Sequence, residues 1–269
     1  MKQDQLFTIK PILVILNIQL IKWISDKLNF EFMDLDNFPS SLRFVLRDIL
    51  EVGSSAPFRN YYQWVSTSVY EYAVKNNIKE IVELGAGGAP ITRCLINKYP
   101  DWDVTFKISD LNPDISTFKS LEDSDKRVVA IYTPLDFTKK MNSFQNSLLV
   151  LSAAFHHVPE KNRRASLNGL KALSKHVMLF EPVCPQIASV LLNLGILITG
   201  VLTPLIRINS KSFFRSVVWC WLIPIASILL LWDGTVSALR CWSKQEWQFN
   251  EPEAEITESL FCAKILLKK

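Results

Sequence analysis

The fold of this 269-residue chain is decided by residues 81–90, IVELGAGGAP. A short apolar run followed by a glycine turn and a helical pattern is typical of a buried strand that leads into a helix. Gly85 and Gly87 let the backbone approach a ligand closely, because they carry no Cβ atom. The helix that follows offers free N–H groups at its N-terminus. The stretch therefore predicts a site for a nucleotide-like ligand where a strand ends.

Short β-branched runs alternate with helical runs around that stretch, which indicates parallel strands joined by helical crossovers. We predict strands at 80–84, 104–109, 128–132, 147–151 and 177–180. Helices are predicted at 89–98, 115–121 and 160–174, and residues 254–267 predict two more strands around Glu258 and Ser259. The pattern predicts a doubly wound α/β sheet of seven strands, with its ligand beyond the carboxyl ends of the strands.

Helical patterns precede the sheet over residues 38–75, with a break at 53–57. The second of these helices carries Arg59, Tyr61 and Trp64, which are candidates to close over a bound cofactor. Further upstream, apolar residues between positions 12 and 24 follow helical spacing and predict an amphipathic helix. That helix either lies on a membrane or packs on the body of the protein. A signal peptide is disfavoured, because no A-x-A-like cleavage site follows.

Two uncharged apolar stretches, residues 182–206 and 216–232, interrupt the pattern after the fifth strand. The first is long enough to span a bilayer, and the second is marginal. If both crossed as a hairpin, Arg207, Lys211 and Arg215 at its tip would lie opposite the catalytic body, against the positive-inside tendency. We therefore favour a hairpin that dips into one leaflet or forms an apolar lid over a true double span.

Composition narrows the class of protein. A chain that is 49% hydrophobic and 21% charged folds, which excludes disorder, collagen-like repeats and a disulfide miniprotein. A formal net charge of +4 is too mild to indicate nucleic-acid binding. The five cysteines are odd in number and lack C-x-x-C spacing, so we expect reduced thiols and no zinc site. We expect a cytoplasmic protein, with membrane association left open.

Two acids follow predicted strands at positions where a nucleoside would bind. Asp110 can accept hydrogen bonds from both ribose hydroxyls, and its alternative role is an ordinary helix cap. Asp136 can accept a hydrogen bond from an adenine amino group while Phe137 stacks on the ring. The alternative for Asp136 is a solvated loop acid.

Two of the three histidines, His156 and His157, directly follow the fourth predicted strand, at the edge where cofactor and substrate should meet. Neutral imidazole is a natural base near pH 7, so both are candidate catalytic bases. We expect one of the pair only to cap or pack. The local sequence shows no further metal ligands, so we predict no metal site.

The glycine turn also bears on the cofactor. A dinucleotide fingerprint requires glycine at the position of Pro90, which lacks an N–H group. A site for S-adenosylmethionine (SAM) uses an acid just before the glycines, and Glu83 supplies one. A nicotinamide oxidoreductase is therefore the disfavoured alternative.

These residues together resemble the class I SAM-dependent methyltransferases. Residues 83–88 are similar to the glycine motif of that family, with Ala89 in place of its last glycine, whose main role we take to be close packing. A narrower resemblance, to a methyltransferase subgroup with apolar inserts, involves 155–157, 180–182, Thr203, Pro204, Arg207 and the segment WDGTVSALR at 232–240. The resemblance implies SAM as cofactor. The implied cofactor-binding residues are Glu83, Gly85, Ala86, Gly87, Asp110, Leu111, Asp136, Phe137 and Ser152.

We divide the chain into an N-terminal helical region (1–76), a SAM-binding core (77–181), an apolar helical insert (182–232) and a C-terminal helix with a strand pair (233–269). Apolar segments after the fifth strand predict a lipophilic small molecule or lipid as methyl acceptor, with peripheral or monotopic membrane association open. The alternative is a non-catalytic SAM-fold module that binds a membrane or a protein partner. We expect Asp233 to cap a helix that begins at Gly234 rather than to orient Arg240 or a histidine. The oligomeric state is not predicted.

Overall fold

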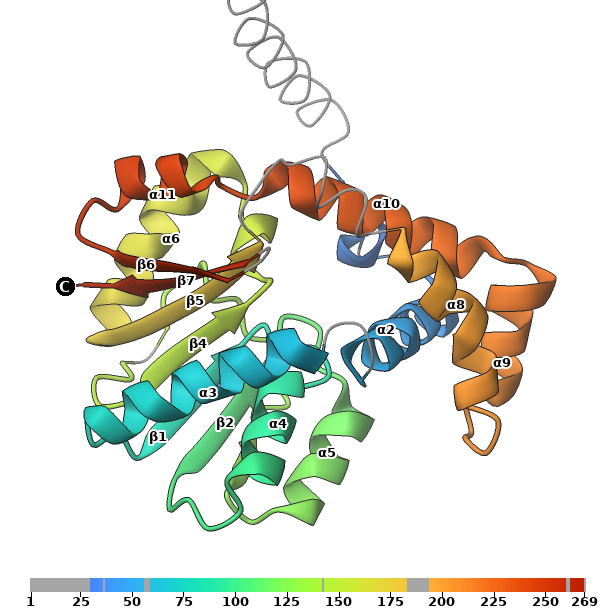
Figure 1. Cartoon of the computed structure of the whole chain (residues 1–269), viewed down its shortest axis with the longest axis horizontal. Coiled ribbons are helices and arrows are strands. Elements are labelled where there is room, and N and C mark those ends of the chain that lie inside the picture. Colours follow the sequence, from blue (N-terminus) through green and yellow to red (C-terminus); the bar gives the residue numbers. More distant parts are fainter. Residues whose placement is uncertain are drawn as a thin grey trace, which may run out of the picture.

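The computed structural model describes residues 30–35, 37–55, 59–141, 143–182, 194–259 and 262–268. Seven strands in these ranges form one sheet in the order β3-β2-β1-β4-β5-β7-β6 (Figure 1). All neighbouring pairs are parallel except the two that involve β7. The strands are β1 (Glu80–Leu84), β2 (Thr105–Ser109), β3 (Val128–Ala130), β4 (Leu148–Ser152), β5 (His176–Pro182), β6 (Glu255–Ser259) and β7 (Cys262–Leu267). The predicted seven-stranded α/β sheet is confirmed.

The predicted strands differ from the observed ones at their ends. β5 runs from His176 to Pro182 rather than over residues 177–180. β3 ends at Ala130 rather than at residue 132, because it has only β2 as a neighbour and pairs with it over three residues. Tyr132 instead donates a hydrogen bond from its hydroxyl to Glu122. In the C-terminal pair, β6 extends through Ser259, so the turn lies later than predicted.

Helices cover both faces of the sheet. One face packs against α3 (Arg59–Lys75), α4 (Pro90–Lys98) and α5 (Ile115–Ser124), and the other against α6 (Glu160–Leu173) and α11 (Lys244–Asn250). Along β4, Leu148 and Val150 join the first core while Leu149 and Leu151 join the second. All four are fully buried, which explains why the strand is a continuous apolar run.

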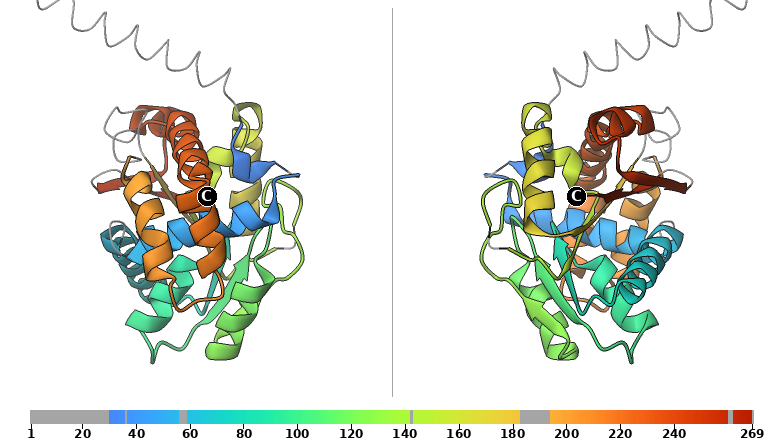
Figure 2. Two further views of the ribbon diagram at one scale, coloured as in Figure 1. Left: turned by 90° about the vertical axis from the view of Figure 1, so that its right-hand side faces the viewer. Right: turned by 90° about the vertical axis from the view of Figure 1, so that its left-hand side faces the viewer.

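A separate group of helices lies beyond the carboxyl ends of the strands, on the right of Figure 1 and facing the viewer in the left view of Figure 2. Its members are α2 (Ser40–Ser55), α8 (Gly195–Ile206), α9 (Phe213–Val217), the π-helical turn η3 (Val218–Leu222) and α10 (Ile225–Arg240). Leu46 and Ile49 of α2 meet Ile196 of α8 and Leu230 of α10 in a third core. The proposed domain boundaries stay a prediction.

The apolar stretches lie only partly within the described ranges. No described helix is by itself both long and apolar enough to cross a membrane, whereas Phe213–Leu222 and Ile225–Arg240 meet that test together, across a bend of 80°. Residues 183–193 and the predicted amphipathic helix at 12–24 lie outside the described residues. The choice between a dipping hairpin and a lid therefore stays a prediction.

The expected helix start at Gly234 is wrong. α10 runs without a break through Asp233 and Gly234 to Arg240. The Asp233 carboxylate caps a different segment, because it accepts hydrogen bonds from the backbone N–H groups of Phe32 (2.8 Å) and Met33 (3.1 Å). These residues open the short 3-10 helix η1 (Phe32–Asp34), so Asp233 fixes the chain before α2 onto α10.

Candidate active site

A cavity of about 1660 Å³ lies at the carboxyl ends of β1 to β4. The loops that follow these strands form one wall, and residues 31–34, α2, α8 and α10 supply the opposite wall. Every residue predicted to bind the cofactor or to act as a base lines this cavity, namely Glu83, Gly85, Ala86, Gly87, Asp110, Leu111, Asp136, Phe137, Ser152, His156 and His157. Of the three residues expected to close over the cofactor, Arg59 lines it, whereas Tyr61 and Trp64 do not. A smaller cavity of about 620 Å³, beside Glu80 and Lys107, contains none of them.

The glycine turn after β1 needs glycine at two positions. Gly85 and Gly87 have φ angles of +67° and +54°, in the left-handed region that disfavours side chains. A Cβ atom on Gly85 would also lie 3.0 Å from the Cβ of Ala154. The turn therefore keeps the backbone free of side chains where it faces the cavity.

We expected the last glycine of the motif, here replaced by Ala89, to serve mainly close packing, but the backbone conformation gives another reason. Its φ and ψ of 52° and 48° are left-handed, and it is the N-cap of α4. Glycine is common at such a position because of its conformation, and not mainly for close packing. Pro90 then occupies the first turn of the helix, where a missing N–H group costs nothing.

Asp110 joins the first two loops of the site. Its Oδ2 accepts a hydrogen bond from the Gly87 N–H (2.7 Å), and its Oδ1 accepts one from the Asn112 N–H (2.8 Å). The next helix, α5, is capped by Asp114 instead. The alternative of Asp110 as a helix cap is therefore wrong.

Glu83 is only 3% exposed and ties β1 to the first turn of α4. Its Oε2 accepts hydrogen bonds from the backbone N–H and the hydroxyl of Thr92, at 3.1 and 2.5 Å. Burial outweighs these bonds and raises the pKa of Glu83 to about 7. Burial thus makes the charged form of Glu83 less favourable than in water.

Asp136 is engaged with its own loop. Its Oδ1 accepts hydrogen bonds from the backbone N–H and hydroxyl of Thr138, and its Oδ2 pairs with Lys139 at 3.2 Å. Partial burial opposes ionisation, but the bonds from Thr138 outweigh it and keep the pKa of Asp136 below its usual value. These contacts are those of a loop acid, and a contact with adenine stays a prediction.

Residues of α3 reach the same edge. The Tyr61 hydroxyl and the Ser152 hydroxyl are 2.7 Å apart, which links α3 to the end of β4. Arg59 and Tyr62 line the cavity. Trp64 instead packs edge-on against Phe180, with ring centroids 5.4 Å apart.

His156 is buried and held by a carboxylate. Its Nδ1 lies 2.7 Å from Oε2 of Glu181, whose Oε1 accepts the N–H groups of Ala154 (2.9 Å) and Phe155 (2.8 Å). Burial alone would raise the pKa of Glu181, but His156 and these N–H donors outweigh it and hold the pKa below its usual range. Because an ionised carboxylate can only accept, Nδ1 of His156 carries the hydrogen of this bond.

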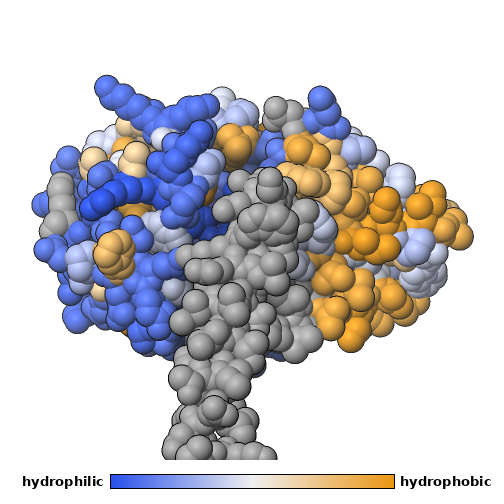
Figure 3. Space-filling view, turned by 90° about the horizontal axis from the view of Figure 1, so that it is seen from above, coloured by the Kyte–Doolittle hydropathy of each residue, from blue (hydrophilic) through white to orange (hydrophobic). Residues whose placement is uncertain are grey.

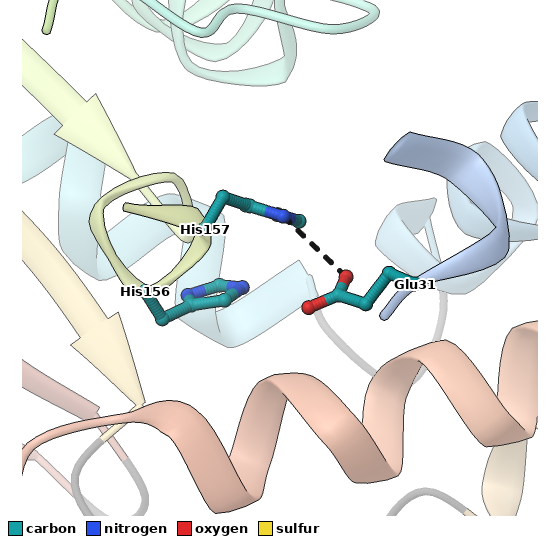
Figure 4. Close-up of side chains that lie close together, drawn as sticks. All are labelled: Glu31, His156 and His157. Carbon is teal, nitrogen blue, oxygen red and sulfur yellow. Dashed lines mark ion pairs between the residues drawn. The ribbon is translucent and has the colours of Figure 1, made fainter. Parts of the chain in front are cut away.

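His157 has a different environment. Its Nδ1 lies 3.0 Å from Oδ2 of Asp34. It also lies 3.5 Å from Oε2 of Glu31, and this ion pair is drawn in Figure 4. Burial works against the charged form, but the Asp34 hydrogen bond and the charges of Glu31 and Asp34 outweigh it. The pKa of His157 rises to about 9, so the ring is an imidazolium at neutral pH.

The acids around His157 were missed from the sequence. Glu31 accepts hydrogen bonds from Ser237 (3.0 Å) and Arg240 (3.1 Å), and Arg240 also donates to the backbone carbonyl of His157 (2.8 Å). Glu31 and Arg240 are 209 positions apart, so no local pattern relates them. Only the resemblance at 232–240 and the Phe180-Glu181-Pro182 segment marked part of this network.

Glu31, His156 and His157 each place one metal-ligand atom within 4.8 Å of the others (Figure 4). Arg240 already pairs with Glu31, and Glu181 occupies Nδ1 of His156. The negative charge of Glu31 is thus balanced by protein cations, and the predicted absence of a metal stays a prediction.

Comparisons by sequence give no relatives, because no protein-family model and no curated protein matches the chain. Solved structures are similar to it in fold. The plantazolicin methyltransferase BpumL, in complex with S-adenosylhomocysteine, has a TM-score of 0.56 at 10% identity, over 96% of this chain and 100% of BpumL. A candidate O-methyltransferase from Nostoc punctiforme PCC 73102 has a TM-score of 0.54 at 11% identity, over 94% of this chain and 68% of that one.

Human N-acetylserotonin methyltransferase, in complex with SAM, has a TM-score of 0.50 at 11% identity, over 85% of this chain. This chain spans about half the length of that enzyme (55%) and of PigF (51%). At such identities the likeness shows a shared fold, a Rossmann-like sheet with flanking helices.

Proposed function

We propose that this protein is a SAM-dependent methyltransferase that methylates a hydroxyl group of a lipophilic small molecule or lipid. The observation that carries the proposal is that one cavity brings together the Gly85–Gly87 turn, Asp110 and the His156–Glu181 pair. The fold shared with solved methyltransferases supports the same conclusion.

The loops after β1 and β2 suit the nucleoside part of SAM. Each Asp110 oxygen accepts one backbone N–H group and keeps a lone pair that can accept a ribose hydroxyl. Leu111 is 54% exposed at the cavity and offers an apolar surface to a base. Glu83 near the end of β1 and Ser152 at the end of β4 also line the cavity, where we propose that they contact SAM.

SAM supplies an already activated methyl group, so the protein must align the acceptor, exclude water and remove a proton. We assign the proton to Nε2 of His156, because Glu181 holds the hydrogen on Nδ1 and favours the positive charge that develops on the ring. His157 does not suit this role, since it is already protonated at neutral pH. We assign His157 to positioning the acceptor oxygen by its charge.

The wall opposite the cofactor loops carries apolar side chains among charged ones such as Arg47 and Asp48, and we assign the apolar ones to the acceptor. Ile196 and Ile206 of α8 and Leu230 of α10 line the cavity there. The volume of about 1660 Å³ exceeds that of a typical single-ligand pocket, which leaves room for an acceptor beside the cofactor. Lipophilic acceptors partition into membranes, so we propose that the enzyme collects its acceptor at a membrane surface.

The test is transfer of radiolabel from methyl-labelled SAM into material extractable with organic solvent, using a total lipid extract and a panel of lipophilic phenols and alcohols. Wild-type protein should label a product, and His156→Gln should lower the rate by about 10²–10⁴-fold without weakening SAM binding. His176→Gln is the matched control. His176 is the first residue of β5, so it lies at the amino end of the strand, away from the cavity, and it contacts Tyr72. Full activity of His156→Gln would refute the assigned base, and SAM binding without transfer to any acceptor would favour the non-catalytic module.

A further inference from the structure

Helix α8 is apolar on both of its faces. It contains no charged residue, and its inner face, which includes Thr199, Gly200 and Thr203, is buried against the neighbouring helices. The contact with α10 is close, because a Cβ atom on Gly200 would lie 1.8 Å from the Ser227 hydroxyl oxygen. The inner face of α8 therefore packs against α10, whereas Ile198 and Leu205 on its outer face are more than half exposed.

That outer face continues over α9, η3 and the start of α10. We call it the apolar face and define it by Ile198, Val201, Leu205, Phe214, Leu222 and Ile228, which are 54–79% exposed. Thirteen of the 23 large hydrophobic side chains that are exposed among the described residues lie between Leu194 and Ile228. Figure 3 shows them as one hydrophobic region at the end of the molecule that contains these helices. Single exposed apolar residues are ordinary, but a contiguous patch marks a binding surface.

Charge indicates what binds there. Residues 194–232 include Arg207, Lys211 and Arg215 and no acidic residue. Arg207 pairs with Asp48 and Glu51. Lys211 is exposed on the turn between α8 and α9, and Arg215 within α9 places its guanidinium over the Phe44 ring, 5.1 Å from the ring centroid. Trp221, 43% exposed, lies at the elbow before α10. Apolar side chains bordered by cations and an indole ring are complementary to the interface of an anionic bilayer.

The dimensions favour lying in the interface over crossing it. The 12 residues of α8 are about 18 Å long, against a hydrocarbon core of about 30 Å. The elbow of 80° between Phe213–Leu222 and Ile225–Arg240 turns the chain through nearly a right angle, so these two helices do not form one straight span. This is the geometry of a monotopic contact with one leaflet.

We propose that the apolar face docks into one leaflet of an anionic phospholipid bilayer. The same helices line the part of the cavity that we assign to the acceptor, through Ile196, Ile206 and Leu230. Docking would therefore place this part of the cavity next to the lipid. This inference adds a binding surface to the proposed function and does not depend on methyl transfer.

Vesicle flotation of the full chain tests the proposal, with phosphatidylcholine alone and with about one third phosphatidylserine. Wild-type protein should float with the anionic vesicles, and the triple variant Ile198→Glu, Phe214→Glu, Leu222→Glu should lose at least about tenfold in binding. Phe249→Glu is the matched control, because Phe249 is 85% exposed on α11 at the far end of the molecule. Lys211→Gln should weaken anionic binding roughly fivefold, and Lys161→Gln on α6 should not.

Unchanged flotation of the triple variant would overturn the proposal and assign membrane binding to another part of the chain. A wild-type dimer that the triple variant dissociates, without vesicle binding, would also overturn it, because a second copy would then cover the face. The triple variant and Phe249→Glu should both bind SAM by calorimetry, because the apolar face lies outside the cofactor loops. Loss of flotation with SAM binding intact therefore concerns the apolar face alone, whereas a lack of SAM binding by the wild type would concern the proposed function.

Discussion

The cavity has two halves that are built in different ways, and we name them by the ligands that we propose for them. The cofactor half consists of turns that directly follow β1, β2 and β4, and its key contact joins Gly87 to Asp110, 23 positions apart. The acceptor half joins residues from opposite ends of the chain, such as Glu31 and Arg240. Parallel strands bring their carboxyl ends together by topology, whereas the acceptor half depends on how separate helices pack. Substitutions in one half should leave the contacts of the other half unchanged, and we expect the largest effect in the cofactor half.

The largest effect is expected from Asp110→Ala in the cofactor half. Loss of a charged acceptor of hydrogen bonds should cost about 1.5–3 kcal/mol, or roughly 10–100-fold in SAM affinity by calorimetry. The pKa of His157 should not change, because Asp110 is not among the groups that shift it. Affinity within twofold of wild type would show that Asp110 does not hold the ribose.

Gly85→Ala should destabilise the protein by about 2 kcal/mol, because a left-handed backbone and a close contact with Ala154 both oppose a side chain there. Gly88→Ala is the control from the same turn, since it has open space and no left-handed φ. Urea denaturation measures both. Equal effects of the two substitutions would contradict the described geometry of the turn.

Asp34→Asn in the acceptor half should lower the pKa of His157 by about one unit, which corresponds to about 1.4 kcal/mol. The physical reason is loss of the charge that accepts the Nδ1 hydrogen bond. NMR titration of the imidazole ring measures the shift, with Asp123→Asn on α5 as control. An unchanged pKa would mean that residues 30–35 do not lie against His157 in solution.

The same ion pair makes the stability depend on pH. The pKa of His157 is about 9 in the folded protein against an ordinary value of 6.5, so its stabilisation is complete below pH 6.5 and is lost as pH rises through 9. Allowing for screening by solvent, we expect a loss of about 1 kcal/mol. Denaturation between pH 6 and 10 measures it, and Asp34→Asn should flatten the profile. A profile identical to that of wild type would argue against the pair.

The smallest effect is expected from Ala153→Gly, beside His156 but outside both networks. Ala153 has a φ of 49° and an exposed side chain, so glycine relieves strain without losing buried surface. We expect a gain of about 0.5 kcal/mol in the free energy of unfolding. A clear loss of stability would contradict the left-handed conformation.

The two halves also explain what could be predicted from the sequence. The glycine turn, the acid after β2 and the histidines after β4 are adjacent to strands with strong apolar patterns, so they were placed correctly. Asp233 was misjudged because a polar residue before glycine in an apolar run suggests a helix start, whereas its partners are the N–H groups of Phe32 and Met33, about 200 positions away. His156 and His157 are equivalent in the sequence, and only their partners in the structure, Glu181 and Asp34, distinguish the roles that we propose for them.

SAM binding in the cofactor half is the property on which the other proposals for the site depend. Isothermal titration calorimetry of the purified protein with SAM, S-adenosylhomocysteine and NADH tests it most directly. We predict saturable binding of SAM and S-adenosylhomocysteine at one site per chain, and none of NADH. Binding of NADH without SAM, or of none of the three, would contradict the claim.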